Sequence, residues 1–225
     1  MLVSHSHRFI FIHVGKTAGM SIRNTLEPYA TEPERFKIRR PARLKDGKPN
    51  PLYPMWETLL LHPTARDVRR EIPAEIFDGY LKFAFVRNPW DFLVSTYTFM
   101  LRDPDIPRHA EVKALGSFDA FLRWAIAEKS PFPKGITKLQ SDMLTDEAGN
   151  LLVDVIGRYE SLNADFAGIC QRVGIEAALP HLNRSRHADY RAAYTAETRA
   201  LVAEHFRQDI DNFNYTFDGL KGRAA

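Results

Sequence analysis

Several features are scarce in this chain of 225 residues, and each absence narrows what the protein can be. Its single cysteine, Cys170, excludes an internal disulfide, and the surrounding segment 166–173 indicates a helix position rather than a nucleophile. The apolar run at 9–14 is too short for a signal peptide, and no run approaches the ~18 residues of a membrane helix. Internal repeats, heptads and low-complexity tracts are absent. We therefore expect a soluble, cytoplasmic protein.

The chain also lacks a large excess of either charge, because its 31 Lys and Arg residues nearly balance its 28 Asp and Glu residues and leave a formal net charge of +3. This mild basicity says little by itself, and we predict no nucleic-acid partner. A local excess occurs at 35–48, where the only acid is Asp46. This segment predicts an exposed basic loop, which is either an acceptor-side lid for an anionic substrate or a solvated linker.

The order of apolar segments predicts strands alternating with helices. With 44% hydrophobic residues, the chain can bury the core of one domain over 1–225. We expect an α/β fold, P-loop-like, with three α/β/α layers around a central parallel sheet. Buried strands are predicted at 8–14, 81–86 and 151–156, and helices at about 18–28, 55–61, 64–71, 89–102, 118–128, 162–173 and 195–206. Ser117, Ser161 and Thr195 are expected to begin the last three of these helices.

The first strand ends in a sequence that favours an anion. Gly15-Lys16-Thr17-Ala18-Gly19, with Ser21 just beyond, joins the strand to a helix, whose free backbone N–H groups and dipole add to the charge of the lysine. A nucleoside-triphosphatase P-loop would need a glycine where Ile10 stands, and no acidic strand end is present to hold Mg²⁺. The alternative is an ordinary surface lysine at a helix start.

The second strand-to-helix turn repeats this arrangement. Arg87 follows the strand at 81–86, Asn88 can cap a helix that starts at Pro89, and Ser95 lies about two turns along that helix. Open α/β sheets bind ligands at the carboxyl ends of their strands, which favours an anion site at Arg87. Alternatively, Arg87 forms a salt bridge to Asp91 at the helix start.

Together these segments resemble a known family. The segment 13–21 resembles the 5′-phosphosulfate loop of carbohydrate-type sulfotransferases, and 85–91 with Ser95 resembles their 3′-phosphate motif. Looser similarity at 62–66, 157–162 and 182–185 extends the resemblance over most of the chain. Two departures stand out: Gly15 replaces a proline, which leaves the loop more flexible, and Met20 replaces a threonine, which removes a hydroxyl from the anion shell.

The resemblance, to a bacterial relative of the Golgi carbohydrate and heparan-sulfate 2-O-sulfotransferases, implies a reaction. A sulfuryl group would pass from 3′-phosphoadenosine-5′-phosphosulfate (PAPS) to an acceptor hydroxyl, on a carbohydrate, leaving 3′-phosphoadenosine 5′-phosphate (PAP). Lys16 would stabilise charge on the leaving phosphate, and Arg87 with Ser95 would hold the 3′-phosphate. Arg184 and Ser185 would add contacts at the adenosine end, or would belong to an ordinary surface turn.

Among the eight histidines, His62 is the candidate base. It precedes the Arg87 motif by roughly the interval seen in the heparan-sulfate 2-O-sulfotransferase branch, and Pro63 fixes the turn behind it. Imidazole titrates near neutral pH and suits proton removal from a hydroxyl. The alternative is a helix-end histidine bonded to backbone. His13, beside the loop, fits an orienting role better than that of a base.

Other interpretations stay open. His5 and His7 lack further ligands at metal-binding spacing, so we predict no metal. A P-loop-type kinase would bind ATP with Mg²⁺, and a non-catalytic polyanion-binding module would use the basic loop. Animal members of the family carry an N-terminal membrane anchor, whereas the initial methionine and early strand favour a complete bacterial-type protein. Neither the acceptor nor the oligomeric state can be predicted.

Overall fold

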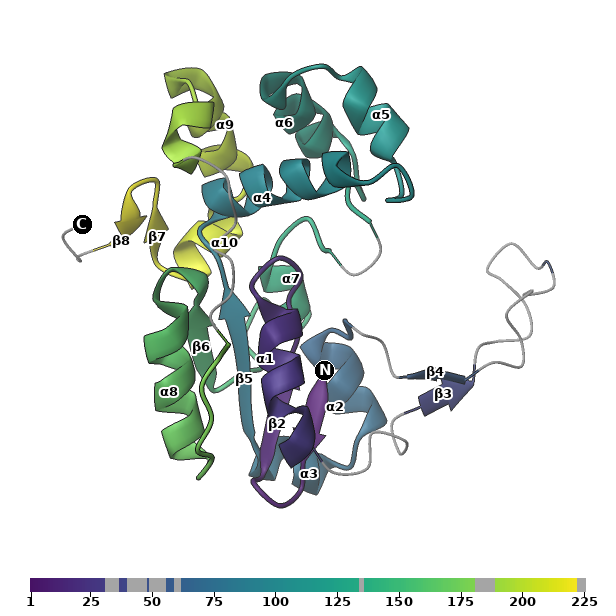
Figure 1. The fold of residues 1–225 in the computed structure, drawn as a ribbon, viewed down its shortest axis with the longest axis vertical. Coiled ribbons are helices and arrows are strands. Elements are labelled where there is room, and N and C mark those ends of the chain that lie inside the picture. The colour runs from purple at the N-terminus through teal and green to yellow at the C-terminus, as the bar shows by residue number, and fades with distance from the viewer. Residues whose placement is uncertain are drawn as a thin grey trace.

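A four-stranded sheet lies at the centre of the computed structural model, which describes residues 1–30, 37–39, 48, 56–58, 62–133, 136–180 and 189–221. The strand order is β1-β2-β5-β6 (Figure 1). β1 pairs antiparallel with β2, whereas β2, β5 and β6 run parallel. Their bounds are Leu2–Ser4 for β1, Phe9–Ile12 for β2, Leu81–Val86 for β5 and Val155–Arg158 for β6.

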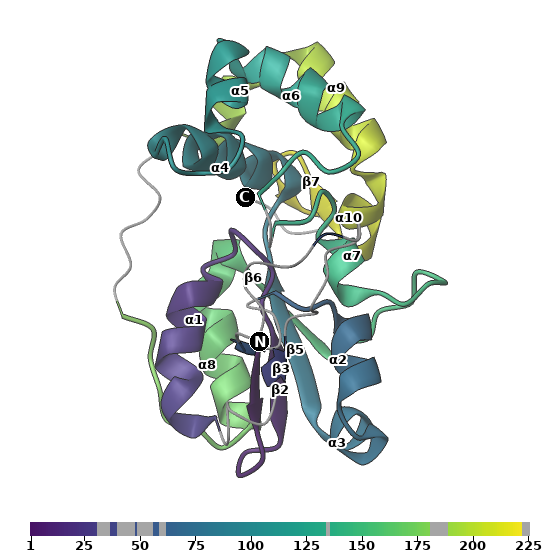
Figure 2. The same cartoon turned by 90° about the vertical axis from the view of Figure 1, so that its right-hand side faces the viewer.

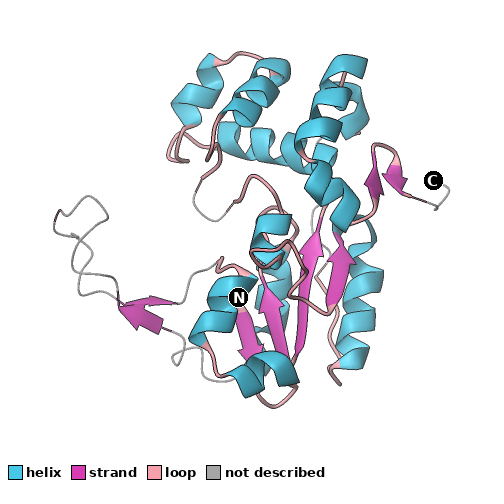
Figure 3. Cartoon of the chain, turned by 180° about the vertical axis from the view of Figure 1, so that it is seen from behind, coloured by secondary structure: helices cyan, strands magenta, loops and turns pink. Residues whose placement is uncertain are grey.

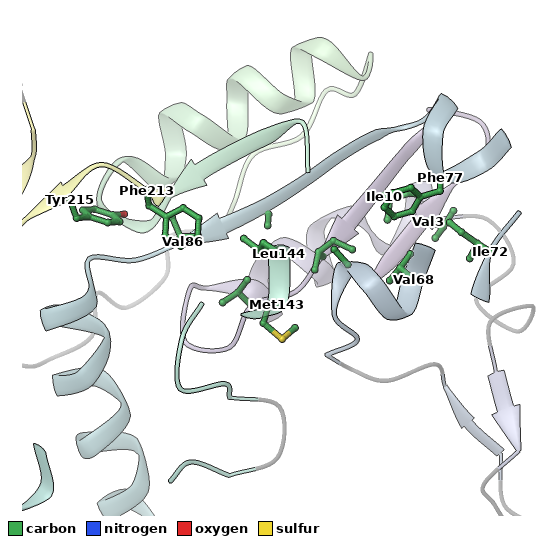
Figure 4. Close-up of a cluster of buried hydrophobic side chains, with 14 residues drawn as sticks. Val3, Ile10, Val68, Ile72, Phe77, Val86, Met143, Leu144, Phe213 and Tyr215 are labelled. Carbon is green, nitrogen blue, oxygen red and sulfur yellow. The ribbon is translucent and has the colours of Figure 1, made fainter. Parts of the chain in front are cut away.

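Alternate side chains of the central strands divide the core between the two faces of the sheet. The phenylalanines at 9, 11, 83 and 85 pack with α1 (Gly19–Leu26) and α8 (Leu162–Arg172). The residues that alternate with these phenylalanines pack on the other face with α2 (Ala65–Glu71), α3 (Ala74–Gly79) and α7 (Ser141–Leu144); they are Ile10, Ile12, Ala84 and Val86. Figure 2 shows helices on both sides of the sheet, and Figure 4 shows the second cluster. The predicted three-layer α/β/α arrangement is confirmed, with a sheet that is mostly parallel.

A second group of helices lies beyond the carboxyl ends of the parallel strands (Figures 1 and 3). It comprises α4 (Pro89–Arg102), α5 (His109–Ala114), α6 (Phe118–Ala127) and α9 (Ala196–His205), followed by α10 (Arg207–Asn212). Aromatic and aliphatic side chains of α4, α6 and α9 share a buried cluster. Ser117 and Thr195 cap α6 and α9 as predicted, each accepting a backbone N–H with its side-chain oxygen.

Three local predictions are wrong. Within the segment 55–61, the described residues form strand β4 (Trp56–Thr58) instead of a helix, pairing with β3 (Lys37–Arg39). The strand predicted at 151–156 begins only at Val155, because Leu151 pairs with Thr145 and the N–H of Leu152 bonds to the carbonyl of Leu144 at the end of α7. Ser161 does not cap α8; its hydroxyl donates to Asp165 instead.

Two short hairpin strands, β7 (Tyr215–Thr216) and β8 (Gly219–Leu220), end the described chain. Most of the basic segment 35–48 lies outside the described residues, although Lys48 is exposed. Across the described ranges, no helix combines the length and the apolar character that crossing a bilayer requires.

Candidate active site

The turn between β2 and α1 contains backbone N–H groups at residues 15–19. Among the described residues, no side chain accepts a hydrogen bond from them. Lys16 and Ala18 adopt left-handed conformations, with φ of 64° and 63°, while Thr17 between them does not. Alternating handedness of this kind turns successive N–H groups toward one point and forms an anion-binding concavity. α1 has neither a side-chain cap nor an acidic residue in its first turn. Its positive end is therefore open to an anion.

Gly19 is required here by a close approach rather than by its φ. A Cβ at this position would lie 1.9 Å from Cδ2 of the His13 ring, so any side chain would displace the ring. The ring of His13 is buried, and burial lowers its pKa to about 2, which keeps it neutral. The loop thus packs against an uncharged imidazole, and the positive charge at the loop comes from Lys16 and not from His13.

Lys16 lies among cations and an aromatic ring. Its Nζ is 4.1 Å from the centroid of Phe99 on α4, and the guanidinium of Arg102 lies 5.2 Å from the same ring. Burial, together with the nearby charges of Arg87 and Arg102, lowers the pKa of Lys16 to about 8. Because like charges surround it, this lysine gains from the arrival of an anion.

The turn between β5 and α4 is built differently. Asn88 caps α4 by accepting the N–H of Trp90 at 3.1 Å, and Pro89 occupies the first helical position. Arg87 is only 2% exposed and donates from Nε to Asp91 at 2.7 Å. Its guanidinium carbon lies 3.9 Å from the ring centroid of Tyr159. The salt bridge foreseen as the alternative interpretation of Arg87 therefore exists, and it occupies Nε of a guanidinium that has five N–H donors.

The two turns meet at the edge of the sheet. β2 and β5 are parallel neighbours, so their carboxyl ends lie side by side. Nη1 of Arg87 donates to the main-chain carbonyl of Lys16 at 3.4 Å. Ser95 is buried on α4, the helix that also supplies Phe99. The guanidinium of Arg87 thus lies beside the main chain of Lys16, where the two turns adjoin.

His62 precedes the N-cap of α2 and contacts the strand that leads into the lysine loop. Its Nδ1 lies 3.0 Å from the carbonyl oxygen of His13, and the centroids of the two imidazole rings are 4.2 Å apart. Since a carbonyl only accepts, Nδ1 carries the proton and the neutral ring has its lone pair on Nε2. Burial lowers the pKa of His62, an effect that the carbonyl bond partly offsets. The backbone bond of the alternative interpretation is present, and it leaves Nε2 able to take a proton.

Sequence reasoning missed two side chains that hold the second turn. Glu160 accepts the N–H of Asn88 at 2.6 Å and the hydroxyl of Tyr215 at 2.8 Å. Gln140 contacts the main chain of Arg87 on both its N–H and its carbonyl. The segment 157–162 that resembles the family signalled Glu160, but nothing in the sequence pointed to Gln140.

Other predicted features lie elsewhere. Arg184 and Ser185 fall outside the described residues, so their part in the site stays a prediction. A groove of about 500 Å³ lies along β6, α8 and the C-terminal hairpin, and none of the predicted donor-binding residues that the structure describes lines it. In the described part of the chain, no three His, Cys, Asp or Glu side chains gather as metal ligands would. The absence of a metal from the reaction stays a prediction.

Comparisons with known proteins agree with this geometry. A family model described as the sulfotransferase family matches residues 1–216. The chain belongs to the sulfotransferase family. This membership makes it a sulfuryl-transferring enzyme, and it favours that interpretation over the kinase and the polyanion-binding module.

Individual relatives of this sulfotransferase are distant. An Archaeoglobus fulgidus protein named only as uncharacterized is 31% identical over 129 residues, which cover 55% of this chain and 93% of that protein. The crystal structure of mouse sulfotransferase SULT7A1 complexed with PAP matches with a TM-score of 0.51 and 13% identity, covering 94% of this chain and 86% of that one. At this identity the match shows the fold alone.

Proposed function

We propose that this enzyme transfers the sulfuryl group of PAPS to an acceptor hydroxyl, with the donor held between the β2–α1 and β5–α4 turns. The observation that carries the proposal is the contact between Arg87 and the carbonyl of Lys16, which brings two cationic turns together in a sulfotransferase-family chain. PAP, the ligand named for the mouse neighbour, carries phosphates at both ends of its ribose and suits such a pair of turns.

At the first turn, the donor's 5′-phosphosulfate would meet backbone N–H groups from Gly15 to Gly19 and the charge of Lys16. Thr17 already donates its hydroxyl to the carbonyl of Val14 at 2.9 Å, so it contributes mainly by fixing the loop. Ser21, in the first turn of α1, already donates its backbone N–H to the carbonyl of Ala18 at 3.0 Å, so its hydroxyl is what it would offer the donor. As the S–O bond to the phosphate breaks, negative charge grows on the leaving oxygen, and Lys16 stabilises it most in the transition state.

At the second turn, the guanidinium of Arg87 and the hydroxyl of Ser95 would hold the 3′-phosphate. Guanidinium and phosphate match in geometry, because paired N–H groups meet two oxygens. This contact would carry the preference for PAPS over nucleotides that have a free 3′-hydroxyl. Arg184 and Ser185 are proposed as further contacts at the adenosine end.

His62 would act as the general base. Its Nε2 takes the proton of the acceptor hydroxyl, the freed oxygen attacks sulfur in line, and the bond from sulfur to the phosphate oxygen breaks as PAP leaves. A lowered pKa keeps His62 unprotonated at neutral pH, which a base requires. Lys16 neutralises the departing phosphate on the opposite side of the sulfur.

The acceptor is proposed to be a carbohydrate, on the resemblance of 13–21 and 85–91 to the carbohydrate-type members of the family. The cytoplasmic location stays a prediction from the sequence.

The test is direct transfer. Purified enzyme is incubated with ³⁵S-labelled PAPS and a panel of glycans, simple alcohols and phenols, and PAP binding is measured by calorimetry. We expect PAP to bind and label to pass to at least one glycan. Absence of PAP binding contradicts the proposal, and labelling of phenols alone contradicts the carbohydrate acceptor. Mg²⁺-dependent ATP binding would instead support the kinase, and salt-sensitive heparin retention without PAP binding would support the polyanion module.

A further inference from the structure

The main chain of Arg87 is held by a side chain from a distant part of the sequence. Oε1 of Gln140 accepts the N–H of Arg87 at 2.8 Å, and its Nε2 donates to the carbonyl of Arg87 at 2.7 Å. The β5–β6 ladder ends at Val86, so Arg87 is the first residue without a strand partner. The amide of Gln140 therefore hydrogen-bonds the main chain of Arg87, as a neighbouring strand hydrogen-bonds the residues before it.

Gln140 is itself held by a buried carboxylate. Asp209 on α10 accepts the N–H of Gln140 at 2.8 Å and the N–H of Ser141 at 2.7 Å, one on each oxygen. Gln140 is fully buried and Asp209 is 1% exposed. Burial raises the pKa of Asp209 to about 6, so holding this carboxylate in the core costs free energy. The contacts thus form one chain that runs from Asp209 through Gln140 to Arg87.

The main chain of Arg87 matters because the described contacts of the side chain are made by the guanidinium group at its end. Asp91 accepts a hydrogen bond from Nε, and the ring of Tyr159 lies against the guanidinium group. The direction from which the side chain enters the site is set by the main chain at residue 87. A shift of that main chain would move the paired N–H groups off the phosphate oxygens, whose recognition depends on geometry.

We propose that Gln140, oriented by Asp209, is a positioning residue that sets Arg87 for the donor's 3′-phosphate. This inference rests on the proposed function, since it assumes that Arg87 meets that phosphate. It assigns to Gln140 no contact with the donor. Its effect should therefore appear only with ligands that carry a 3′-phosphate.

The experiment compares two nucleotides by calorimetry in wild type and variants. PAP carries the 3′-phosphate and adenosine 5′-phosphate lacks it, so the dissociation constant of adenosine 5′-phosphate divided by that of PAP measures recognition of that group alone. A weaker contact with the 3′-phosphate lowers this ratio. Gln140→Met keeps the length of the side chain and removes both hydrogen bonds. We expect it to weaken PAP binding about tenfold, equivalent to about 1.4 kcal/mol, and to leave adenosine 5′-phosphate binding unchanged.

A nearby residue provides the matched control. Thr145 is also buried, and its hydroxyl donates to the carbonyl of Ser141 at 2.9 Å; none of its described hydrogen bonds joins it to Gln140, Asp209 or Arg87. Thr145→Ala should keep the wild-type ratio. Asp209→Asn replaces one accepting oxygen with an NH₂ group and should lower the ratio less than Gln140→Met does. It also supplies the test if Gln140→Met does not fold.

The outcomes separate the inference from the proposed function. A lowered ratio in Gln140→Met or Asp209→Asn, with Thr145→Ala unchanged, supports the positioning role. A wild-type ratio in folded Gln140→Met and Asp209→Asn overturns it, and so does an equal loss in Thr145→Ala. If wild type itself binds PAP no better than adenosine 5′-phosphate, the proposed 3′-phosphate contact is wrong and the inference falls with it.

Discussion

The turn after β2 and the turn after β5 leave neighbouring parallel strands at the same edge of the sheet, but their helices begin in opposite ways. α1 starts with no side-chain cap and no acid, on a loop with two left-handed residues. α4 starts with an asparagine cap, a proline and the acid Asp91, and the residue before its cap is hydrogen-bonded on both main-chain groups.

This difference indicates a division of labour. On the proposed function, the first turn would direct backbone N–H groups and a lysine at charge that changes during the reaction. The second turn, in which both main-chain groups of Arg87 are hydrogen-bonded and its side chain is bonded to Asp91, would present a rigid cation to a phosphate whose charge stays constant. Preorganisation suits recognition, whereas an unpaired cation suits a developing charge.

Loss of His62, which contacts the strand entering the first turn, should have the largest effect on turnover. His62→Ala is expected to lower kcat about 10³-fold, because no group then takes the hydroxyl proton, while PAP affinity stays unchanged. Steady-state kinetics and calorimetry measure the two effects. The matched control is His109→Ala, since Nδ1 of His109 also bonds a backbone carbonyl, that of Met100, at 2.9 Å. Full activity in His62→Ala would mean that another group is the base.

Removing the lysine of the first turn should have the second-largest effect on catalysis. Lys16→Met is expected to lower kcat/KM for the donor about 10²-fold, since it removes a charge aimed at the leaving phosphate. The free energy of unfolding should stay the same or rise, because burial beside Arg87 and Arg102 already disfavours the charged lysine. Kinetics and urea unfolding report the two quantities. Lys113→Met, at an exposed position on α5, is the control. Unchanged kinetics in Lys16→Met would contradict this role.

Removing the arginine of the second turn should affect stability as well as binding. Arg87→Met leaves the buried carboxylate of Asp91 without its partner, and breaking such a pair costs about 3 kcal/mol of unfolding free energy. The double variant Arg87→Met/Asp91→Leu should recover most of this stability in urea unfolding and none of the PAP affinity. Equal stability of single and double variants would show that the pair is not coupled.

The pH dependence distinguishes the turns further. The pKa of Lys16 is lowered to about 8, so the free enzyme loses this positive charge as pH rises above that value. We expect kcat/KM for the donor to fall up to tenfold per pH unit on the alkaline side, since kcat/KM reports ionisation of the free enzyme. Lys16→Arg should abolish this fall, because arginine stays charged. A flat profile in wild type up to pH 9.5 would contradict the assignment.

The smallest expected effect concerns Met20, the second residue of α1. Its side chain is 54% exposed, so substitution should change stability by no more than about 0.5 kcal/mol. Met20→Thr restores the family's hydroxyl and should tighten PAP binding about fivefold, as one added hydrogen bond would. Met20→Glu places a negative charge at the same point and should weaken binding. Calorimetry measures both, and a shift in the same direction for both variants would contradict the expected anion contact.

The sequence predicted best where one local rule decides the structure. The segments at 9–12 and 81–86 are apolar at nearly every position, as strands covered on both faces are, and Ser117 and Thr195 cap their helices. The prediction of a strand at 151–156 failed because Leu151 and Leu152 pair with the C-terminal end of α7 and the residue after it, which no local pattern encodes.

The same limit applies to the site. Lys16 and Arg87 were identified because each stands in a strand-to-helix turn with a local pattern. Gln140 and Asp209 lie on segments that meet Arg87 only in the folded chain, 53 residues separating Gln140 from Arg87 and 69 separating it from Asp209. Periodicity and capping rules contain no information on such contacts.

A crystal structure of the enzyme with PAP shows whether one nucleotide occupies both turns. We expect a single nucleotide spanning them, with its 5′-phosphate on the N–H groups of 15–19 and Lys16, and its 3′-phosphate in contact with Arg87 and Ser95. A nucleotide bound at only one of these turns, or in the groove along β6 and α8, would contradict it.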